Sequence, residues 1–127
     1  MTREYPKEET DGLKRHCEKL TGFSEGGHDY FVLEGLLLPA GCSPERIDAL
    51  LCPTNRGDGY PSRLFFAGPV TSSKSLNWTV NGQVLNVSAA RIGERNWWAF
   101  SWRVDLPSPT LPAMLREHLS AFVRGMA

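Results

Sequence analysis

The sequence predicts an α+β protein whose strands pair antiparallel. Short apolar segments separated by turn-forming residues fill the middle of the chain, and helical patterns stand at both ends. The loops between the expected strands are too short to contain crossover helices, so neighbouring strands must run antiparallel. The length of 127 residues fits a single domain, and we expect residues 1–6 to form a mobile start.

The first helix is expected over residues 7–20, which have helical propensity. Its apolar stripe is thin and consists of Leu13, Cys17 and Leu20. Gly26 and Gly27 then mark a turn before the first strand. This helix is therefore predicted from propensity more than from an amphipathic pattern.

Four segments of the middle region indicate strands or a hairpin. Residues 29–38 form a nearly continuous apolar run, which predicts a strand buried on both faces. Residues 45–52 fit a strand or a short helix, and their position between two turn clusters favours the strand. Residues 63–67 predict a third strand. Asn81-Gly82 stands between two β-branched runs, which is the pattern of a two-residue type I′ hairpin.

The end of the chain holds an aromatic segment and a helix. Residues 96–104 predict a further strand or a buried aromatic segment. Thr110 follows two prolines and is a candidate N-cap for the C-terminal helix. The apolar stripe of that helix consists of Leu111, Leu115, Leu119, Phe122 and Met126.

Composition and charge argue against several classes of protein. The 14 basic side chains balance the 14 acidic ones, so we expect no nucleic-acid partner bound through bulk charge. No apolar run approaches the roughly 18 residues that span a bilayer, and no secretory signal is visible, so we expect no membrane partner. The 3 cysteines form no CxxC motif, which predicts a reducing cytoplasm with no disulfide framework and no metal site.

Three of the 4 tryptophans fall in the aromatic segment, at Trp97, Trp98 and Trp102. In a strand, Trp97 lies on the face opposite to Trp98 and Trp102, so one face can be core while the other is partly exposed. An exposed tryptophan often anchors a partner at an interface. The segment is therefore either a core strand or a strand that also presents a binding surface.

The cysteines and histidines carry weaker signals. Cys17 and Cys52 fit small buried hydrophobic residues, whereas Cys42 in the turn PAGCSP is expected to be the most exposed. A nucleophilic cysteine needs a base or a positive neighbour to form the thiolate, and the residues next to Cys42 in its turn supply neither. The 3 histidines are isolated from one another and indicate surface or boundary positions.

Several short motifs, in their order and spacing over residues 29–125, are similar to a bacterial branch of the ubiquitin-conjugating-enzyme superfamily, prokaryotic family E. The motifs are Leu38-Pro39-Ala40-Gly41, Gly59-Tyr60-Pro61, Gly68-Pro69, the Trp97, Phe100 and Ser101 pattern, and His118-Leu119. The resemblance implies a UBC-like fold with an N-terminal helix, an antiparallel four-stranded meander and a C-terminal helix. The hairpin at Asn81-Gly82 would be an addition to that fold.

The departures from this family bear on catalysis. Conjugating members carry a cysteine after the meander, which accepts a ubiquitin-like protein as a thioester, and this chain has no cysteine after Cys52. The family's histidine is also missing, because Ser101 is followed by Trp102 and Arg103. A thioester needs a thiol. The chain is therefore expected to lack the usual mechanism at the usual place.

Three functions remain open at this point. The first is a non-catalytic binder of a ubiquitin-like protein or of its activating enzyme, without cofactors. The second is an active transferase with a displaced nucleophile, for which Cys42 and Ser101 are the candidates. The third is an unrelated α+β protein-binding module. Under the first function the resemblance implies a cytoplasmic, bacterial conjugation pathway such as one of antiphage defence, and it leaves the oligomeric state unspecified.

The expected partner-binding surface combines one loop with the aromatic segment. Its residues are Tyr60, Pro61, Trp97, Trp98 and Arg103. Loops held by a rigid scaffold often carry function, and an arginine can pair with a carboxylate or a carbonyl of a partner.

Overall fold

A computed structural model describes residues 1–72, 79–80, 83–84, 87–100 and 110–124. The helices are α1 (Lys7–Lys14) and α2 (Leu111–Arg124). The strands are β1 (Lys19–Glu25), β2 (His28–Leu37), β3 (Cys42–Ser43), β4 (Arg46–Cys52), β5 (Arg63–Phe66), β6 (Thr71–Ser72), β7 (Thr79–Val80), β8 (Gln83–Val84), β9 (Val87–Ile92) and β10 (Arg95–Phe100). Within the described residues, no helix is both long and apolar enough to cross a membrane.

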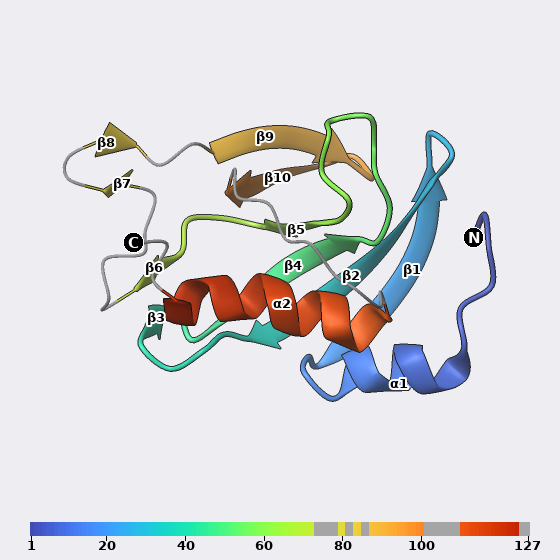
Figure 1. Cartoon of the computed structure of the whole chain (residues 1–127), viewed down its shortest axis with the longest axis horizontal. Coiled ribbons are helices and arrows are strands. Elements are labelled where there is room, and N and C mark those ends of the chain that lie inside the picture. Colours follow the sequence, from blue (N-terminus) through green and yellow to red (C-terminus); the bar gives the residue numbers. More distant parts are fainter. Residues whose placement is uncertain (73–78, 81–82, 85–86, 101–109, 125–127) are drawn as a thin grey trace.

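Six strands form one curled antiparallel sheet in the order β1-β2-β4-β5-β10-β9 (Figure 1). Two short pairs, β3 with β6 and β7 with β8, lie outside this sheet. The α+β class and the antiparallel pairing are therefore confirmed. The main sheet has six strands, two more than the expected four.

The first difference from the sequence prediction lies between α1 and the turn at Gly26 and Gly27. Helix α1 ends at Lys14, whereas the predicted helix extends to residue 20, and β1 begins at Lys19. β1 pairs with β2 over the full range from Lys19↔Glu34 to Glu25↔His28, and Gly26 and Gly27 form the turn with φ of +60° and +80°. The apolar stripe of residues 7–20 is too thin to stabilise a longer helix by packing. The turn at Gly26 and Gly27 instead closes a hairpin, in which Leu20 packs against the first core.

The second difference is β9, a strand that the sequence analysis did not separate from the preceding hairpin. It pairs with β10 through a two-residue turn at Gly93 and Glu94, both with positive φ, as a type I′ turn requires. β10 begins at Arg95, close to the expected boundary, while residues 101–104 lie outside the described residues.

The remaining predictions of elements fare as follows. The strands expected at 29–38, 45–52 and 63–67 and the C-terminal helix are confirmed as β2, β4, β5 and α2. β7 and β8 pair through Val80↔Gln83, on either side of the expected turn. The turn residues themselves and Met126 lie outside the described residues.

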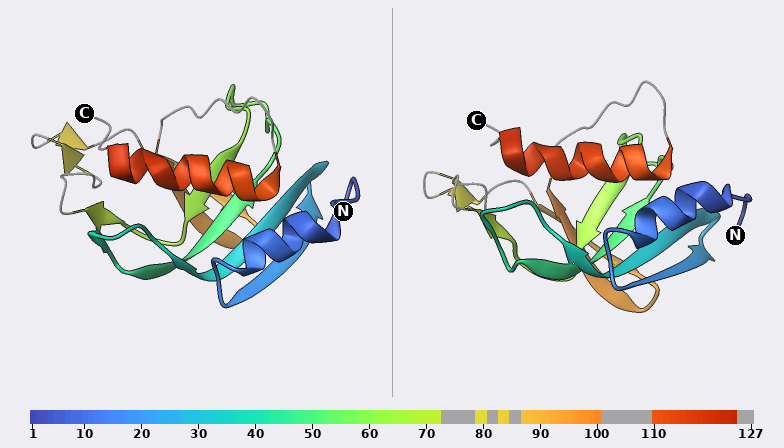
Figure 2. Two further views of the ribbon diagram at one scale, coloured as in Figure 1. Left: turned by 60° about the horizontal axis from the view of Figure 1, so that its bottom comes forward. Right: turned by 90° about the horizontal axis from the view of Figure 1, so that it is seen from below.

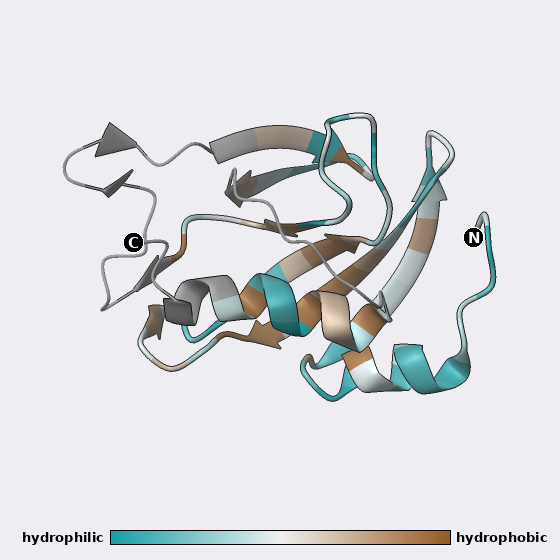
Figure 3. Cartoon of the chain, in the orientation of Figure 1, coloured by the Kyte–Doolittle hydropathy of each residue, from teal (hydrophilic) through white to brown (hydrophobic). Residues whose placement is uncertain are grey.

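One face of the sheet packs against both helices (Figures 1 and 2). Leu33, Leu51 and Phe66 from the strands meet Leu13 of α1 and Leu115 of α2 in this first core. Hydrophobic residues are concentrated on β2 and β4, while the first turns of α1 are hydrophilic (Figure 3). The helices therefore contribute one apolar side each and leave their polar sides to solvent.

A second core covers the other face, because the β9–β10 hairpin bends over it. Phe65 and Leu50, at the centre of the sheet, contact Trp97 and Ile92 from the hairpin. Alternation along β5 sends Phe66 to the first core and Phe65 to the second. The central strands are therefore apolar on both faces.

Asp29 fastens the N-terminal segment to the sheet. Its carboxylate, 1% exposed, accepts hydrogen bonds from Thr2 N and Oγ1, from Tyr5 Oη and from Ser24 Oγ at 2.6–3.1 Å. Burial by itself would raise the pKa of Asp29, but these hydrogen bonds outweigh it and hold the pKa well below its usual range. Burial and the Asp29 carboxylate raise the pKa of Tyr5 to about 12. Whether residues 1–6 are mobile in solution stays a prediction.

Asp29→Ala should lower the free energy of unfolding by about 3 kcal/mol, because it leaves several donors without their buried acceptor. Tyr5→Phe removes one of these hydrogen bonds and should cost only about 1 kcal/mol. Urea denaturation at pH 7 measures both. An Asp29→Ala variant as stable as the wild type would mean that the segment contributes nothing to the fold.

Candidate functional site

The loop between β4 and β5, residues 53–62, is held in shape by its own side chains. Asn55 Oδ1 accepts a hydrogen bond from Gly57 N at 2.7 Å, and Asp58 Oδ1 accepts one from Tyr60 N at 3.2 Å. Gly57 and Gly59 have φ of +91° and +87°, a region that favours glycine. The sequence of the loop therefore specifies two successive tight turns.

Arg63, at the start of β5, anchors the loop from below. Its side chain is 5% exposed, and its guanidinium donates a hydrogen bond to Asp58 Oδ2 at 3.3 Å. The same group lies over the Tyr60 ring, 4.0 Å from the ring centroid. The buried cation thus has a carboxylate and an aromatic face as partners, and both residues belong to the loop.

Arg56 ties the loop to the second core. Its Nε donates a hydrogen bond to Tyr30 Oη at 2.9 Å, and its guanidinium lies 5.3 Å from the centroid of Phe65. A second guanidinium nitrogen lies 3.8 Å from Asp58 Oδ2. The Asp58 carboxylate therefore lies between the guanidinium groups of Arg56 and Arg63. The hydrogen bond from Arg56 to Tyr30 attaches this part of the loop to the sheet.

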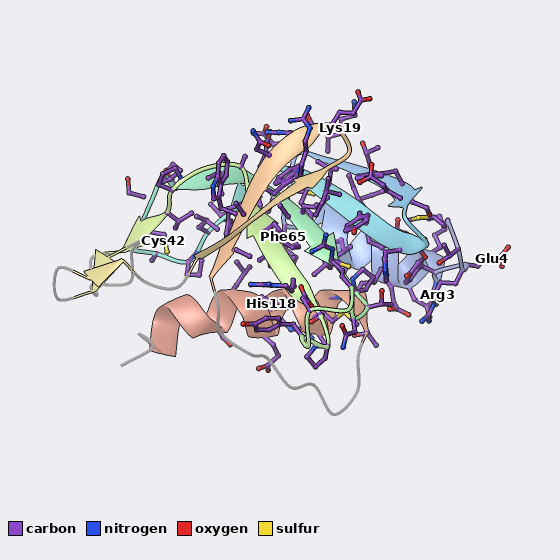
Figure 4. The ribbon with its side chains drawn as sticks, turned by 90° about the horizontal axis from the view of Figure 1, so that it is seen from above. Arg3, Glu4, Lys19, Cys42, Phe65 and His118 are labelled. Carbon is purple, nitrogen blue, oxygen red and sulfur yellow. The ribbon has the colours of Figure 1, made fainter. Side chains whose placement is uncertain are left out.

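His118 of α2 and Ser62 fasten the other end. His118 Nε2 lies 2.9 Å from Ser62 Oγ, and the two residues are 4% and 3% exposed. The hydroxyl or the ring donates this hydrogen bond, depending on the tautomer of the imidazole. Figure 4 locates His118 on α2, next to β5 and the loop that precedes it.

A serine next to a neutral histidine has the geometry of a nucleophile with its general base. Two observations argue against that role. Both side chains are buried, so no substrate atom can reach Ser62 Oγ. Burial, followed by the positive charge of Arg63, lowers the pKa of His118 to about 4, which makes the imidazole a weak base at neutral pH. The pair is therefore a structural link between α2 and the loop.

Of the predicted surface residues, the structure places two on the loop rim. Pro61 is exposed and Tyr60 is half-buried against Arg63. Trp98 of β10 is half-buried and pairs with Phe66. Arg103 and the candidate nucleophile Ser101 lie outside the described residues.

The structure corrects the expectation for Trp97. Its side chain is 2% exposed in the second core, and its Nε1 donates a hydrogen bond to the Ile92 carbonyl at 3.1 Å. The Arg95 guanidinium covers the indole, 4.5 Å from its centroid. The bend of the β9–β10 hairpin over the sheet turns this side chain inward, so Trp97 cannot anchor a partner.

The three cysteines are thiols in apolar or partly buried places. Cys52 is buried, while Cys17 and Cys42 are half-buried. Burial raises the pKa of all three thiols, and for Cys52 this outweighs the nearby charge of Arg56. Cys42, the candidate nucleophile, lines an open hollow of about 490 Å³ together with Leu37 and Pro39. Each cysteine is therefore protonated at neutral pH and is a poor nucleophile.

Sequence reasoning missed the polar cluster beneath the loop, formed by Asp58, Ser62, Arg63 and His118. Ser62 and His118 are 56 positions apart, and no local pattern links them. Arg63 had a weak signal, since it stands at the start of an otherwise apolar strand.

Comparison with protein-family models, with curated proteins and with solved structures finds no match to this chain. The resemblance to ubiquitin-conjugating enzymes therefore depends on the quoted motifs. Within the described residues, no three His, Cys, Asp or Glu side chains are grouped so as to hold a metal ion.

His118 should make the fold sensitive to mild acid. Its folded pKa of about 4 lies below the ordinary value of about 6.5, so the unfolded chain binds more protons between these values. Stability should be constant above pH 6.5 and fall by about 3 kcal/mol as the pH drops to 4. The contribution of Asp29 is lost only below pH 4, since its folded pKa lies under its unfolded one.

Urea denaturation between pH 7.5 and 4.5 checks this dependence. His118→Gln should make the free energy of unfolding nearly independent of pH in this range. Ser62→Ala keeps the buried imidazole, so it should retain the pH dependence at a lower free energy of unfolding. An unchanged slope in His118→Gln would assign the acid sensitivity to another group.

Trp97→Ala should lower the free energy of unfolding by about 4 kcal/mol, because it empties a large part of the second core. Trp98→Ala, at a half-buried position of the same strand, should cost less than about 2 kcal/mol. Thermal and urea denaturation distinguish the two variants. Equal losses would contradict the assignment of Trp97 to the core.

Proposed function

We propose that this chain is a non-catalytic protein of the ubiquitin-conjugating-enzyme type, which binds a ubiquitin-like protein or its activating enzyme. The observation that carries the proposal is the placement of the cysteines: none follows Cys52, and Cys17, Cys42 and Cys52 are half-buried or buried. A conjugating enzyme needs a reactive thiolate. The order of the motifs and the short helix before the antiparallel strands support membership of that superfamily.

The loop of residues 53–62 supports a binding role. Its exposed rim presents Asn55, Gly57, Gly59 and Pro61, while Arg56, Arg63 and Asp58 hold the backbone beneath. Because the backbone of this rim is already ordered in the free protein, it loses little conformational entropy when a partner binds. Tyr60 adds a ring whose orientation is set by the Arg63 guanidinium, and aromatic residues are common at the centres of interfaces.

The displaced nucleophile at Cys42 has less support. Burial raises the pKa of its thiol. A thiol with a raised pKa forms less of the thiolate that attacks. The proposed role is therefore to bind a ubiquitin-like protein or its activating enzyme, without transferring the ubiquitin-like protein.

Intact mass after incubation with ATP, an activating enzyme and a ubiquitin-like protein from the same genome tests the non-catalytic part. We expect no covalent adduct on the chain. A conjugating enzyme with an active-site cysteine serves as the positive control in the same mixture. An adduct removed by thiol reductant, and lost in Cys42→Ala, would overturn the proposal in favour of the displaced cysteine.

The binding part is tested by titrating the same two proteins against the chain in a calorimeter. Tyr60→Ala should weaken the complex about fivefold or more, because it removes the ring at the rim. Tyr60→Phe keeps the ring over Arg63 and should bind nearly as the wild type does. No binding to either protein would leave the chain outside this pathway.

A further inference from the structure

Within the described residues, the outer edge of β1 has no neighbouring strand. β1 lies at one end of the main sheet and has β2 as its neighbour, at the margin opposite β9 (Figure 1). Its pairing with β2 is continuous over all 7 residues, and its burial pattern leaves 5 of them exposed. Neither a proline nor a bulge interrupts the strand. Proteins usually protect such an edge, because its free N–H and C=O groups can pair with another strand.

The charges of β1 are self-complementary. Lys19 and Glu25 stand at its two ends and lie on the same face, since their positions differ by an even number. A second copy of β1 running antiparallel about Gly22 would place Lys19 of each copy opposite Glu25 of the other. Opposite charges directly across two strands stabilise their pairing.

Other symmetric registers lose this match. Centring the pair on Thr21 would set Lys19 against Phe23, and centring it on Phe23 would set Glu25 against Thr21. The register about Gly22 places this glycine at the two-fold axis, with the Met1 side chain packed over its face.

Both charged side chains are exposed. The Glu25 carboxylate also accepts a hydrogen bond from Gly93 N of its own chain at 3.2 Å. Lys19 is exposed and makes no ion pair within the described residues, and it lies at the margin of the molecule in Figure 4. The amine is therefore available to a second copy.

We propose that β1 is the interface of a symmetric homodimer, in which two β1 strands pair antiparallel about Gly22 and join two six-stranded sheets into one. The strand has 7 residues, so the contact is smaller than that of a permanent dimer. The dimer is consequently weak and dissociates on dilution. Its two ion pairs are exposed, so salt weakens it further.

Sedimentation equilibrium of the whole chain over a range of concentrations tests this. We expect a reversible monomer–dimer equilibrium that shifts toward monomer in high salt. Lys19→Glu and Glu25→Lys each oppose like charges at both pairs and should raise the dissociation constant about tenfold. Arg91→Glu, an equal charge change on the other edge strand β9, should leave it unchanged.

An equimolar mixture of Lys19→Glu and Glu25→Lys gives the sharpest readout. In the mixed dimer both charge pairs are complementary again, so association should return to about the wild-type level. Glu25→Gln keeps an acceptor for Gly93 and separates loss of charge from disturbance of the turn. A wild-type chain that stays monomeric at every concentration overturns the proposal and leaves the edge to an extended segment of another protein. A dimer that neither charge variant weakens overturns it as well.

Discussion

The architecture depends on a sheet whose central strands are apolar on both faces. β5 is buried at every position, and the last four residues of β4 are buried too. An apolar face left in water is costly, so each face must be covered. Helices α1 and α2 cover one face, and the β9–β10 hairpin bends over the other. The curl of the sheet and the inward position of Trp97 follow from this single requirement.

The same requirement makes the loop between β4 and β5 a rigid element. Both of its ends emerge from strands buried on two faces, so the loop begins and ends in the core. Arg56 fastens it on the side of the second core, and Ser62 fastens it to α2 on the side of the first. Charged and polar groups that reach so far inward are paired with one another, as buried polar groups must be. The loop is therefore fastened at both of its ends.

The candidate site was predictable only where local sequence carries the information. Tyr60 and Pro61 belong to a turn-rich segment, and its turn-forming residues predict an exposed loop. The pattern of the aromatic segment fits a strand or a buried aromatic segment and does not assign its two faces, since alternation does not say which face is covered. Ser62 and His118 come from segments 56 positions apart and have no shared pattern, so their contact was invisible.

Taken by itself, the sequence determined the α+β class, the antiparallel pairing and four of the main elements, because periodicity and turn residues act locally. It also determined that no cysteine follows Cys52. Only the tertiary structure decided that residues 19–25 form a strand, since their pairing with β2 ends the helix before Lys19, where the pattern predicts it to continue to residue 20. It likewise decided that Trp97 is core and that Arg63 is buried between Asp58 and Tyr60. Those outcomes depend on which distant segments cover each face of the sheet, and no short window of sequence contains that information.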